Sequence, residues 1–434
     1  MGVGEGGSNS GGPGLERYAG YRVTQVQNGS PTQVTWYDRL GRPVKQAKRG
    51  FSGTFIVTAS EFDAMGRLAR SSVPFYLTAP NAAAPYQSTF QYDRLGRMTA
   101  KLAPGAELDP AHGDVATTYT YAGSRTDITV KATAVTCGSN AGNLCMTMQR
   151  YRGVLGLMRT VDAQGGVTRY WYDAAGRALA IADANTPDTT PFPVGRATVA
   201  AYNALGQRVT SSDPTQGTWT FRYNSLGELL SQTDARAWTT SVWKRDGLGH
   251  VRLSSSDSYT SQNTDGSWNT ATRQRTQDEW DYDAATGLLT EVRRCTNPGS
   301  SGCTRVAAAA EWQEHYAYDA AGRVTDTSTT TAGWTDITSS LYDANFGREK
   351  AVVYPSGLRV QTRYGKYGDV VDQLDADSGA RFWGIGAKDA WNNPTLEYYG
   401  NGLIGEYTWS ASTGQSLQRR WRGGEASDTP VQES

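Results

Sequence analysis

The sequence predicts an all-β protein built as a linear array of antiparallel β-hairpins. A seven-residue string, aromatic-Asp-x-x-Gly-Arg-apolar, returns along almost the whole chain, and self-similarity at a short period indicates a repeat architecture. The closest copies lie 21 or 22 residues apart, which is too short for a strand–helix–strand unit but fits two short strands and two tight turns. Only 38% of the residues are hydrophobic and 49 are glycine, which disfavours helices and favours thin sheet layers with aromatic contacts.

The motif occurs in close, loose and degenerate copies. The close copies supply Tyr37, Asp38, Gly41 and Arg42; Asp63, Gly66 and Arg67; Tyr92, Asp93, Gly96 and Arg97; Tyr172, Asp173, Gly176 and Arg177; and Tyr318, Asp319, Gly322 and Arg323. Looser copies start at Tyr202, Tyr223, Tyr282, Tyr342 and Tyr364, and degenerate ones at Tyr151, Arg245 and Ala390. We expect the long gap between Tyr92 and Tyr151 to hide further degenerate copies.

The motif has the chemistry of a hairpin turn. The Asp side chain can accept a hydrogen bond from the backbone two residues on, and Gly supplies the left-handed conformation that closes a type I turn with a bulge. A second turn recurs about ten residues later, at 162–165, 213–217, 354–357 and 375–379. After it comes an alternating stretch such as Thr218–Tyr223, which has the period of a half-buried strand.

Two interpretations of the repeated side chains are open. They could form a row of ligand sites. Alternatively, Tyr packs, Asp and Gly make the turn, and Arg pairs with a neighbouring Asp or stacks on the next Tyr. A motif that returns in every unit is usually what makes neighbouring units fit, so we favour the second interpretation.

Composition excludes several classes of protein. Lys plus Arg equals Asp plus Glu at 42 each, which gives no electrostatic case for nucleic acid or an anionic membrane. No apolar run is long enough to span a bilayer. We expect a flexible Gly/Ser-rich leader at 1–16 that is not a secretory signal, a repeat array at 17–422, and a disordered tail at 423–434.

The four cysteines form two matched pairs, Cys137 with Cys145 and Cys295 with Cys303, and each pair brackets seven loop-like residues. Disulfides across a hairpin tip are the favoured interpretation, and they would imply an oxidising compartment after export. Free thiols are an alternative. Metal binding is a third, although the spacing is wider than that of a zinc knuckle.

No set of residues indicates catalysis. His112, His250 and His315 are isolated, and phosphate loops, nucleophile elbows and zinc-binding helices are missing from the sequence. The acidic stretch from Asp278 to Asp283 could bind calcium, but a solvated face is the favoured interpretation because an EF-hand's Gly and distal Glu are not in place. We expect no enzymatic activity, no cofactor and no metal. The polar insertion at 254–275 is expected to form a long hairpin arm or a mobile loop.

The string Tyr-Asp-x-x-Gly-Arg-Leu with its spacing resembles the YD repeats of the Rhs family, which also occur in bacterial toxin-complex shells and in teneurins. The resemblance runs from about Tyr37 to Tyr399. It implies a strip of antiparallel sheet that spirals into a partial or complete hollow shell, which encloses a C-terminal toxin or forms part of an adhesion molecule. The Asp-Pro-x-Gly-Leu segment that closes such shells has no copy here, so the resemblance implies a scaffold and not self-cleavage. It also suggests a stretch of a longer shell or a truncated product.

Two functions are therefore carried forward. The first is a secreted or surface-exposed bacterial scaffold that encloses or presents a polypeptide cargo, such as a C-terminal toxin segment, or that pairs with flanking shell sequence. The second is a cell-surface adhesin or carbohydrate-binding module, suggested by 13 Trp and 24 Tyr residues; a sugar hydrolase is a distant third. The alternative fold is a β-propeller, in which two units would form one blade.

Overall fold

The computed structural model describes residues 20–27, 29–78, 83–105, 113–133, 145–185, 196–296, 312–331 and 333–423. Within these residues the chain forms 32 strands, and the one helical element is a three-residue 3-10 helix at Thr270–Thr272. The prediction of an all-β fold is therefore confirmed. The expected leader, the alanine run at 307–310 and the expected tail after Gly423 lie outside the described residues, and Gly423 itself ends the last strand.

The strands follow one another at short intervals. In chain order they are β1 (Tyr21–Gln25), β2 (Gln33–Tyr37), β3 (Pro43–Arg49), β4 (Phe55–Phe62), β5 (Leu68–Ser72), β6 (Phe75–Tyr76), β7 (Gln87–Tyr92), β8 (Met98–Ala103), β9 (Val115–Ala122), β10 (Arg125–Ala132), β11 (Cys145–Gly153), β12 (Gly156–Val161), β13 (Val167–Tyr172), β14 (Ala178–Ala182), β15 (Thr198–Tyr202), β16 (Arg208–Asp213), β17 (Gly217–Tyr223), β18 (Leu229–Thr233), β19 (Thr239–Arg245), β20 (Val251–Tyr259), β21 (Arg273–Tyr282), β22 (Leu289–Thr296), β23 (Trp312–Tyr318), β24 (Val324–Thr331), β25 (Trp334–Tyr342), β26 (Glu349–Val353), β27 (Arg359–Tyr364), β28 (Val370–Asp375), β29 (Arg381–Lys388), β30 (Pro394–Tyr399), β31 (Leu403–Trp409) and β32 (Ser416–Gly423).

Neighbouring strands pair antiparallel, and the pairing shifts register at the motif tyrosine. In the β13–β14 hairpin the shift falls between Trp171 and Tyr172. A type I turn closed by a left-handed Gly produces such a bulge. The same shift occurs at Tyr37, Phe62, Tyr92, Tyr202, Tyr223, Tyr282, Tyr318 and Tyr364. The strands belong to one 32-stranded sheet, so the propeller alternative, with its separate four-stranded blades, is wrong.

The chain divides into two compact units. Unit 1 comprises Met1–Met148, Tyr342–Ala351 and Arg359–Ser434, and unit 2 comprises Gln149–Leu341 and Val352–Leu358. The sequence pattern does not change in character at these boundaries, which is why sequence analysis predicts one array and not two units.

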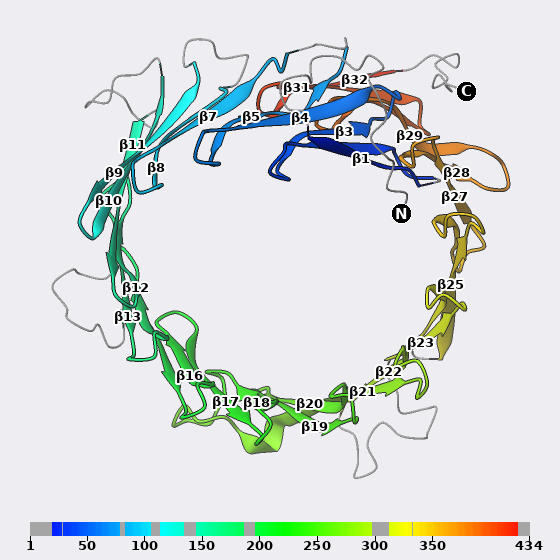
Figure 1. The fold of residues 1–434 in the computed structure, drawn as a ribbon. Helices are drawn as coiled ribbons and strands as arrows, with labels where there is room; N and C mark the ends of the chain where they lie inside the picture. Colours follow the sequence, from blue (N-terminus) through cyan, green and yellow to red (C-terminus); the bar gives the residue numbers. More distant parts are fainter. Residues whose placement is uncertain are drawn as a thin grey trace. The chain divides into compact units, whose positions relative to one another are not determined.

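Unit 1 contains the largest buried apolar cluster. Strand β4 pairs with β3 along one edge and with β5 and β6 along the other. Ala47, Val57 and Phe75 are buried together, and Trp36 and Phe55 pack against them. Figure 1 shows that the first strands of this unit, in blue, lie beside its last strands, in orange and red.

Unit 2 is a single layer of strands (Figure 1). Its buried apolar side chains are small, namely Ala180, Ala182, Ala197 and Cys295. Such a layer gains little from a large apolar core, because the hydrophobic contribution follows the apolar area removed from water. The contacts between neighbouring hairpins must therefore supply much of its stability.

Candidate functional site

Each motif turn is held by the carboxylate of its Asp. In the copy at 172–177, Oδ1 of Asp173 accepts hydrogen bonds from the backbone N–H groups of Ala175 and Arg177, both at 2.9 Å. The backbone N–H of Gly176 donates to the Asp173 carbonyl at 3.0 Å, and the φ of Gly176 is +79°. The hydrogen bond from the Arg177 backbone is the main cause that lowers the pKa of Asp173. The Asp and Gly of the motif thus have complementary parts in one turn.

The motif Arg closes the same turn from its side chain. Its Nε donates to Oδ2 of the Asp four residues earlier, at 2.6 to 2.7 Å in the five close copies: Arg42 to Asp38, Arg67 to Asp63, Arg97 to Asp93, Arg177 to Asp173 and Arg323 to Asp319. Charge-assisted hydrogen bonds of this length are among the stronger ones in proteins. Structurally, the polar atoms of the motif are directed to one another within each copy.

Loose copies keep the geometry with other side chains. Asn203 replaces the Asp, and its Oδ1 accepts from the backbone of Leu205 and Gln207, both at 3.0 Å. Its Nδ2 donates to Oε1 of Gln207 at 2.6 Å, so this turn is a neutral version of the charged one. In the copy that starts at Arg245, Nδ1 of His250 lies 3.0 Å from Oδ2 of Asp246. Sequence analysis did not assign that position to His250.

The motif Arg also contacts the aromatic ring of the next hairpin. The guanidinium of Arg177 lies 4.9 Å from the ring centroid of Tyr202, within the range of a cation–π interaction. The hydroxyl of Tyr202 donates back to the carbonyl of Ala178 at 2.9 Å. We call this reciprocal contact the clamp. It joins neighbouring hairpins at their bulges.

Both contacts of the clamp recur at Tyr92, Tyr121 and Tyr364. Phe62 has no hydroxyl and makes the cation–π contact alone, and Tyr172, Tyr223 and Tyr318 supply the hydroxyl bond. Guanidinium–ring distances of 4.2 to 4.7 Å occur for Arg42 with Phe62, Arg67 with Tyr92, Arg97 with Tyr121 and Arg348 with Tyr364. Hydroxyl-to-carbonyl bonds of 2.6 to 2.9 Å occur at Tyr92, Tyr121, Tyr172, Tyr223, Tyr318 and Tyr364. Tyr121 lies in the gap where a degenerate copy was expected, and it makes the clamp without an Asp turn of its own.

If the clamp couples neighbouring hairpins, removing either of its contacts should lower the free energy of unfolding. Tyr202→Phe removes one hydroxyl bond and should lower the free energy of unfolding by about 1 kcal/mol. Tyr202→Leu removes the ring as well, and a double-mutant cycle of Tyr202→Leu with Arg177→Ala by urea unfolding should give a coupling energy of about 0.5–1 kcal/mol. Arg177→Ala with Tyr223→Leu is the control, because Tyr223 belongs to the next hairpin and its hydroxyl donates to the Arg208 carbonyl. Additive effects for Arg177 and Tyr202 would show that the clamp has no energetic role.

The second turns use the same chemistry as the motif turns. Oδ1 of Asp162 accepts from the backbone of Gln164 at 2.9 Å and of Gly166 at 2.7 Å. The turn at 354–357 has the backbone bonds of this loop with Tyr354 in the Asp position. Both ends of the hairpins are therefore closed by the same kind of loop.

The acidic stretch before Gly287 is paired with arginines, so its interpretation as a solvated face is wrong. The predicted arm is a hairpin of β20 and β21, and β22 runs along its other side. Ion pairs cross these strands: Asp257 with Arg273 and Arg275, Asp278 with Arg294, Asp281 with Arg252 and Arg293, and Glu279 with Arg293. Opposite charges on facing strands stabilise a sheet. The partners are 12 to 29 residues apart in the sequence, so they can be paired only when the register of the strands is known.

Segments distant in sequence meet within unit 1, and we call this region the seam. Motif turns of the last strands contact the first strands at their second turns. Three hydrogen bonds join them: the Tyr76 hydroxyl to the Lys388 carbonyl at 2.7 Å, the Ser412 hydroxyl to the Gly105 carbonyl at 2.5 Å, and the Arg348 guanidinium to the Gly29 carbonyl at 3.4 Å. Sequence analysis gave no signal for these contacts.

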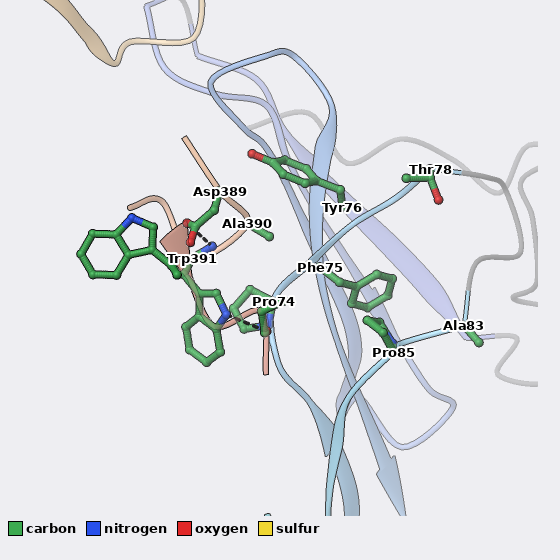
Figure 2. A pocket seen from close by; sticks show the side chains of 11 residues that line it. Pro74, Phe75, Tyr76, Thr78, Ala83, Pro85, Asp389, Ala390 and Trp391 are labelled. Atoms are coloured by element: carbon green, nitrogen blue, oxygen red, sulfur yellow. Dashed lines mark hydrogen bonds between the residues drawn. The ribbon is translucent and has the colours of Figure 1, made fainter. Parts of the chain in front are cut away.

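A cleft of about 420 Å³ opens at the seam. Figure 2 shows Pro74, Phe75 and Pro85 on one side and Trp391 on the other. The turn beside it starts at Asp389, whose side chain accepts a hydrogen bond from the backbone N–H of Trp391. Lys388 takes the aromatic position of the motif, so this degenerate copy begins at Lys388, two residues before the predicted Ala390. The indole N–H of Trp391 donates to the Ala411 carbonyl at 3.0 Å. The polar atom of this tryptophan is therefore already bonded inside the protein.

A buried carboxylate lies among aromatic side chains on β29 to β31. Glu397 accepts from the hydroxyl of Tyr399 at 2.7 Å and from the indole of Trp383 at 3.2 Å. Burial is the main cause that raises the pKa of Tyr407, whose hydroxyl is 3.3 Å from that of Tyr399. Two hydrogen-bond donors satisfy the carboxylate, so the cluster has the features of a structural network.

The remaining candidate residues lie apart. His315 is 3.8 Å from Glu291, and His112 lies outside the described residues. In the part of the chain that the structure describes, groups of three or more His, Cys, Asp or Glu that could hold a metal ion are not found. Cys145 and Cys295 are disulfide-bonded, whereas their predicted partners, Cys137 and Cys303, lie outside the described residues.

Among the described residues, every helix is too short or too polar to cross a bilayer.

A continuous antiparallel sheet, Asp–Gly turns with a bulge at each tyrosine, and a clamp between successive hairpins are the features of a YD-repeat array. Residues 202–255 match the model of the RHS Repeat, so this stretch of the chain carries that repeat. None of the curated proteins compared matches the sequence.

Solved structures share the fold over most of the chain. TcdB2-TccC3 without its hypervariable C-terminal region matches with a TM-score of 0.69 and 16% identity over 92% of this chain and 21% of that one. TcdB2-TccC3-TEV matches with a TM-score of 0.68 and 15% identity, with the same coverage. A Tc holotoxin pore from Photorhabdus luminescens matches with a TM-score of 0.68 and 15% identity over 91% of this chain and 20% of that one. This chain thus spans about a fifth of the length of the structures it matches.

Proposed function

We propose that this protein is a non-enzymatic scaffold whose YD-repeat sheet encloses or presents a polypeptide cargo, in a bacterial toxin-delivery setting. The observation that carries the proposal is the clamp. The charged and hydroxyl groups of the repeated motif bond to the same or the next hairpin, as expected of a wall-building element and not of a row of binding sites.

Two further observations support this function. The disulfide-bonded Cys145 and Cys295 fit an oxidising compartment and hence export from the cell. One similar structure is described as lacking a hypervariable C-terminal region, and another is TcdB2-TccC3-Cdc42. In this chain too, a polypeptide cargo would follow the array or be held by it.

Protease protection tests the proposal. A protease-sensitive polypeptide fused after Ser434 should be digested at least about tenfold more slowly than the same polypeptide alone, because an enclosed chain exposes few cleavable open states. The matched control carries the polypeptide before Met1. Equal digestion of the fused and free polypeptides, with the array itself intact, would reject the cargo role.

The adhesin or carbohydrate-binding alternative has weaker support. Trp409 and Trp391 line the seam cleft, but their indole N–H groups donate to the carbonyls of Pro394 and Ala411. A sugar site needs polar groups that remain free to orient hydroxyls. A glycan array that shows binding, and loss of that binding on Trp219→Ala or Trp409→Ala, would restore this alternative.

A further inference from the structure

The seam has a regular geometry that assigns a role to one position of the motif turn. The three hydrogen bonds across it join residues 312, 307 and 319 positions apart. The two segments therefore run in the same direction at a nearly constant offset, hairpin against hairpin. At each contact a motif turn of the later segment meets a second turn of the earlier one.

The side chain that makes this contact directly precedes the left-handed residue of the motif turn. We call it the tip residue. At three of the four seam turns the tip residue is large and aromatic, namely Phe346 before Gly347, Tyr367 before Gly368, and Trp391 before Asn392, whereas in the fourth turn Thr413 precedes Gly414. A methyl group on Gly29 would lie 2.7 Å from the ring of Phe346, and one on Gly53 would lie 2.8 Å from the hydroxyl of Tyr367. Phe346 and Tyr367 thus rest on glycines of the opposite turns, whereas Trp391 packs against Gly414 of the neighbouring motif turn.

In six motif turns outside the seam the same position is a large, exposed apolar residue, whereas Ala175, Thr286 and Ala321 occupy it in three others. The six large tip residues are Leu40 (77% exposed), Met65 (74%), Leu95 (78%), Leu205 (74%), Leu226 (84%) and Leu248 (77%). Phe346 at the seam is 42% exposed. Scattered exposed leucines need no explanation, but here one position of the repeat carries them in copy after copy.

Suitable acceptor glycines are present in unit 2. Gly165 and Gly357 belong to second turns, have φ values of +87° and +85°, and have open space where a side chain would stand. They offer the surface that Gly29 and Gly53 offer at the seam. The formal net charge of the chain is zero, so long-range repulsion does not oppose the approach of a second molecule.

We propose that the exposed tip residues are a docking surface for the second turns of another YD-repeat layer, and that a second copy of this chain supplies that layer when the chain is alone. The contact would repeat between molecules the stacking that the seam makes within one molecule. It requires no cargo and is independent of the proposed function.

Sedimentation velocity over a range of concentrations tests the proposal. The unchanged chain should self-associate, and the triple variant L205D/L226D/L248D should raise the dissociation constant at least about tenfold. The tips are largely exposed, so the triple variant should fold. Circular dichroism checks that it does. L205M/L226M/L248M should associate like the unchanged chain, because it keeps an apolar tip.

Two further variants separate tip docking from general stickiness. Leu230→Asp, an exposed leucine on strand β18, should leave association unchanged. Gly165→Ala with Gly357→Ala should weaken association from the acceptor side without removing any apolar surface. A chain that stays monomeric at all concentrations, or an L205D/L226D/L248D variant that associates as before, would overturn the proposal. The former result would leave a longer YD-repeat polypeptide as the occupant.

Discussion

Acid should open the charged motif turns below about pH 4, turn by turn and before the array as a whole unfolds, while stability stays nearly constant above about pH 5. Hydrogen bonds to the ionised turn carboxylates lower their pKa in the folded state, chiefly from the backbone N–H of the motif Arg at Asp38, Asp63 and Asp173. A depressed folded pKa stabilises the protein above the unfolded value of about 3.9, and this stabilisation is lost as the pH falls through the folded value. The pKa values of Asp93, Asp319, Asp343 and Asp375 are lowered as well, so the effects accumulate.

The charged turn can be converted to the neutral version that the chain already contains. D173N/R177Q copies the Asn203 and Gln207 pair, which makes the same backbone contacts without a charge. At pH 7 the urea midpoint should change little. Below pH 4 the turn of the D173N/R177Q variant should keep its backbone amides protected from hydrogen exchange, whereas the Asp173 turn of the unchanged chain should lose this protection. Hydrogen exchange at Ala175 and Arg177, compared with Leu205 and Gln207, measures this difference.

The hydrogen-exchange comparison could also show that protonation of the turn carboxylates does not cause the acid sensitivity. If the amides of the Asp173 and Asn203 turns lose protection at the same pH, carboxylate protonation is not the cause. Acid unfolding would then have to come from other groups, such as the Asp–Arg pairs of β20 to β22.

The fold could be predicted because the residues that determine each turn are close together in the sequence. An Asp that caps its own turn and a Gly at positive φ sit three residues apart, as at Asp173 and Gly176, so a single sequence carries the signal in every copy. The Arg-to-Tyr contact was predictable for the same reason, since both residues belong to the repeat. The copy at Ala390 was misplaced because Lys388 stands where the motif has an aromatic residue.

Contacts that depend on the register of strand pairing could not be predicted from the sequence. Arg252 and Asp281 are 29 residues apart, and they meet only because β20 pairs with β21 in one register. The seam joins residues more than 300 positions apart, and nothing local distinguishes Phe346 or Trp391 as a docking residue. Only the three-dimensional structure distinguishes a packed copy of this turn position, such as Phe346, from an exposed one, such as Leu226.

The double variant Gly29→Ala with Gly53→Ala should separate the two segments that meet at the seam. Both glycines have positive φ, +71° and +83°, and a methyl group on either would fall within 2.8 Å of Phe346 or Tyr367. Left-handed backbone costs a non-glycine residue about 1–2 kcal/mol. Displacing the two aromatic tips adds the loss of their packing, and the hydrogen bonds from Tyr76 and Arg348 then lose their geometry.

A matched double variant isolates the contact from the backbone strain. Gly96 and Gly123 belong to the same unit and have φ values of +80° and +61°, with open space where a methyl group would stand. G96A/G123A should therefore show the strain alone. Hydrogen exchange should reveal lost protection at 50–53 and 365–368 in G29A/G53A only. Equal loss in both variants would mean that the aromatic tips do not hold the two segments together, and the docking role inferred for the exposed tips would lose its structural precedent.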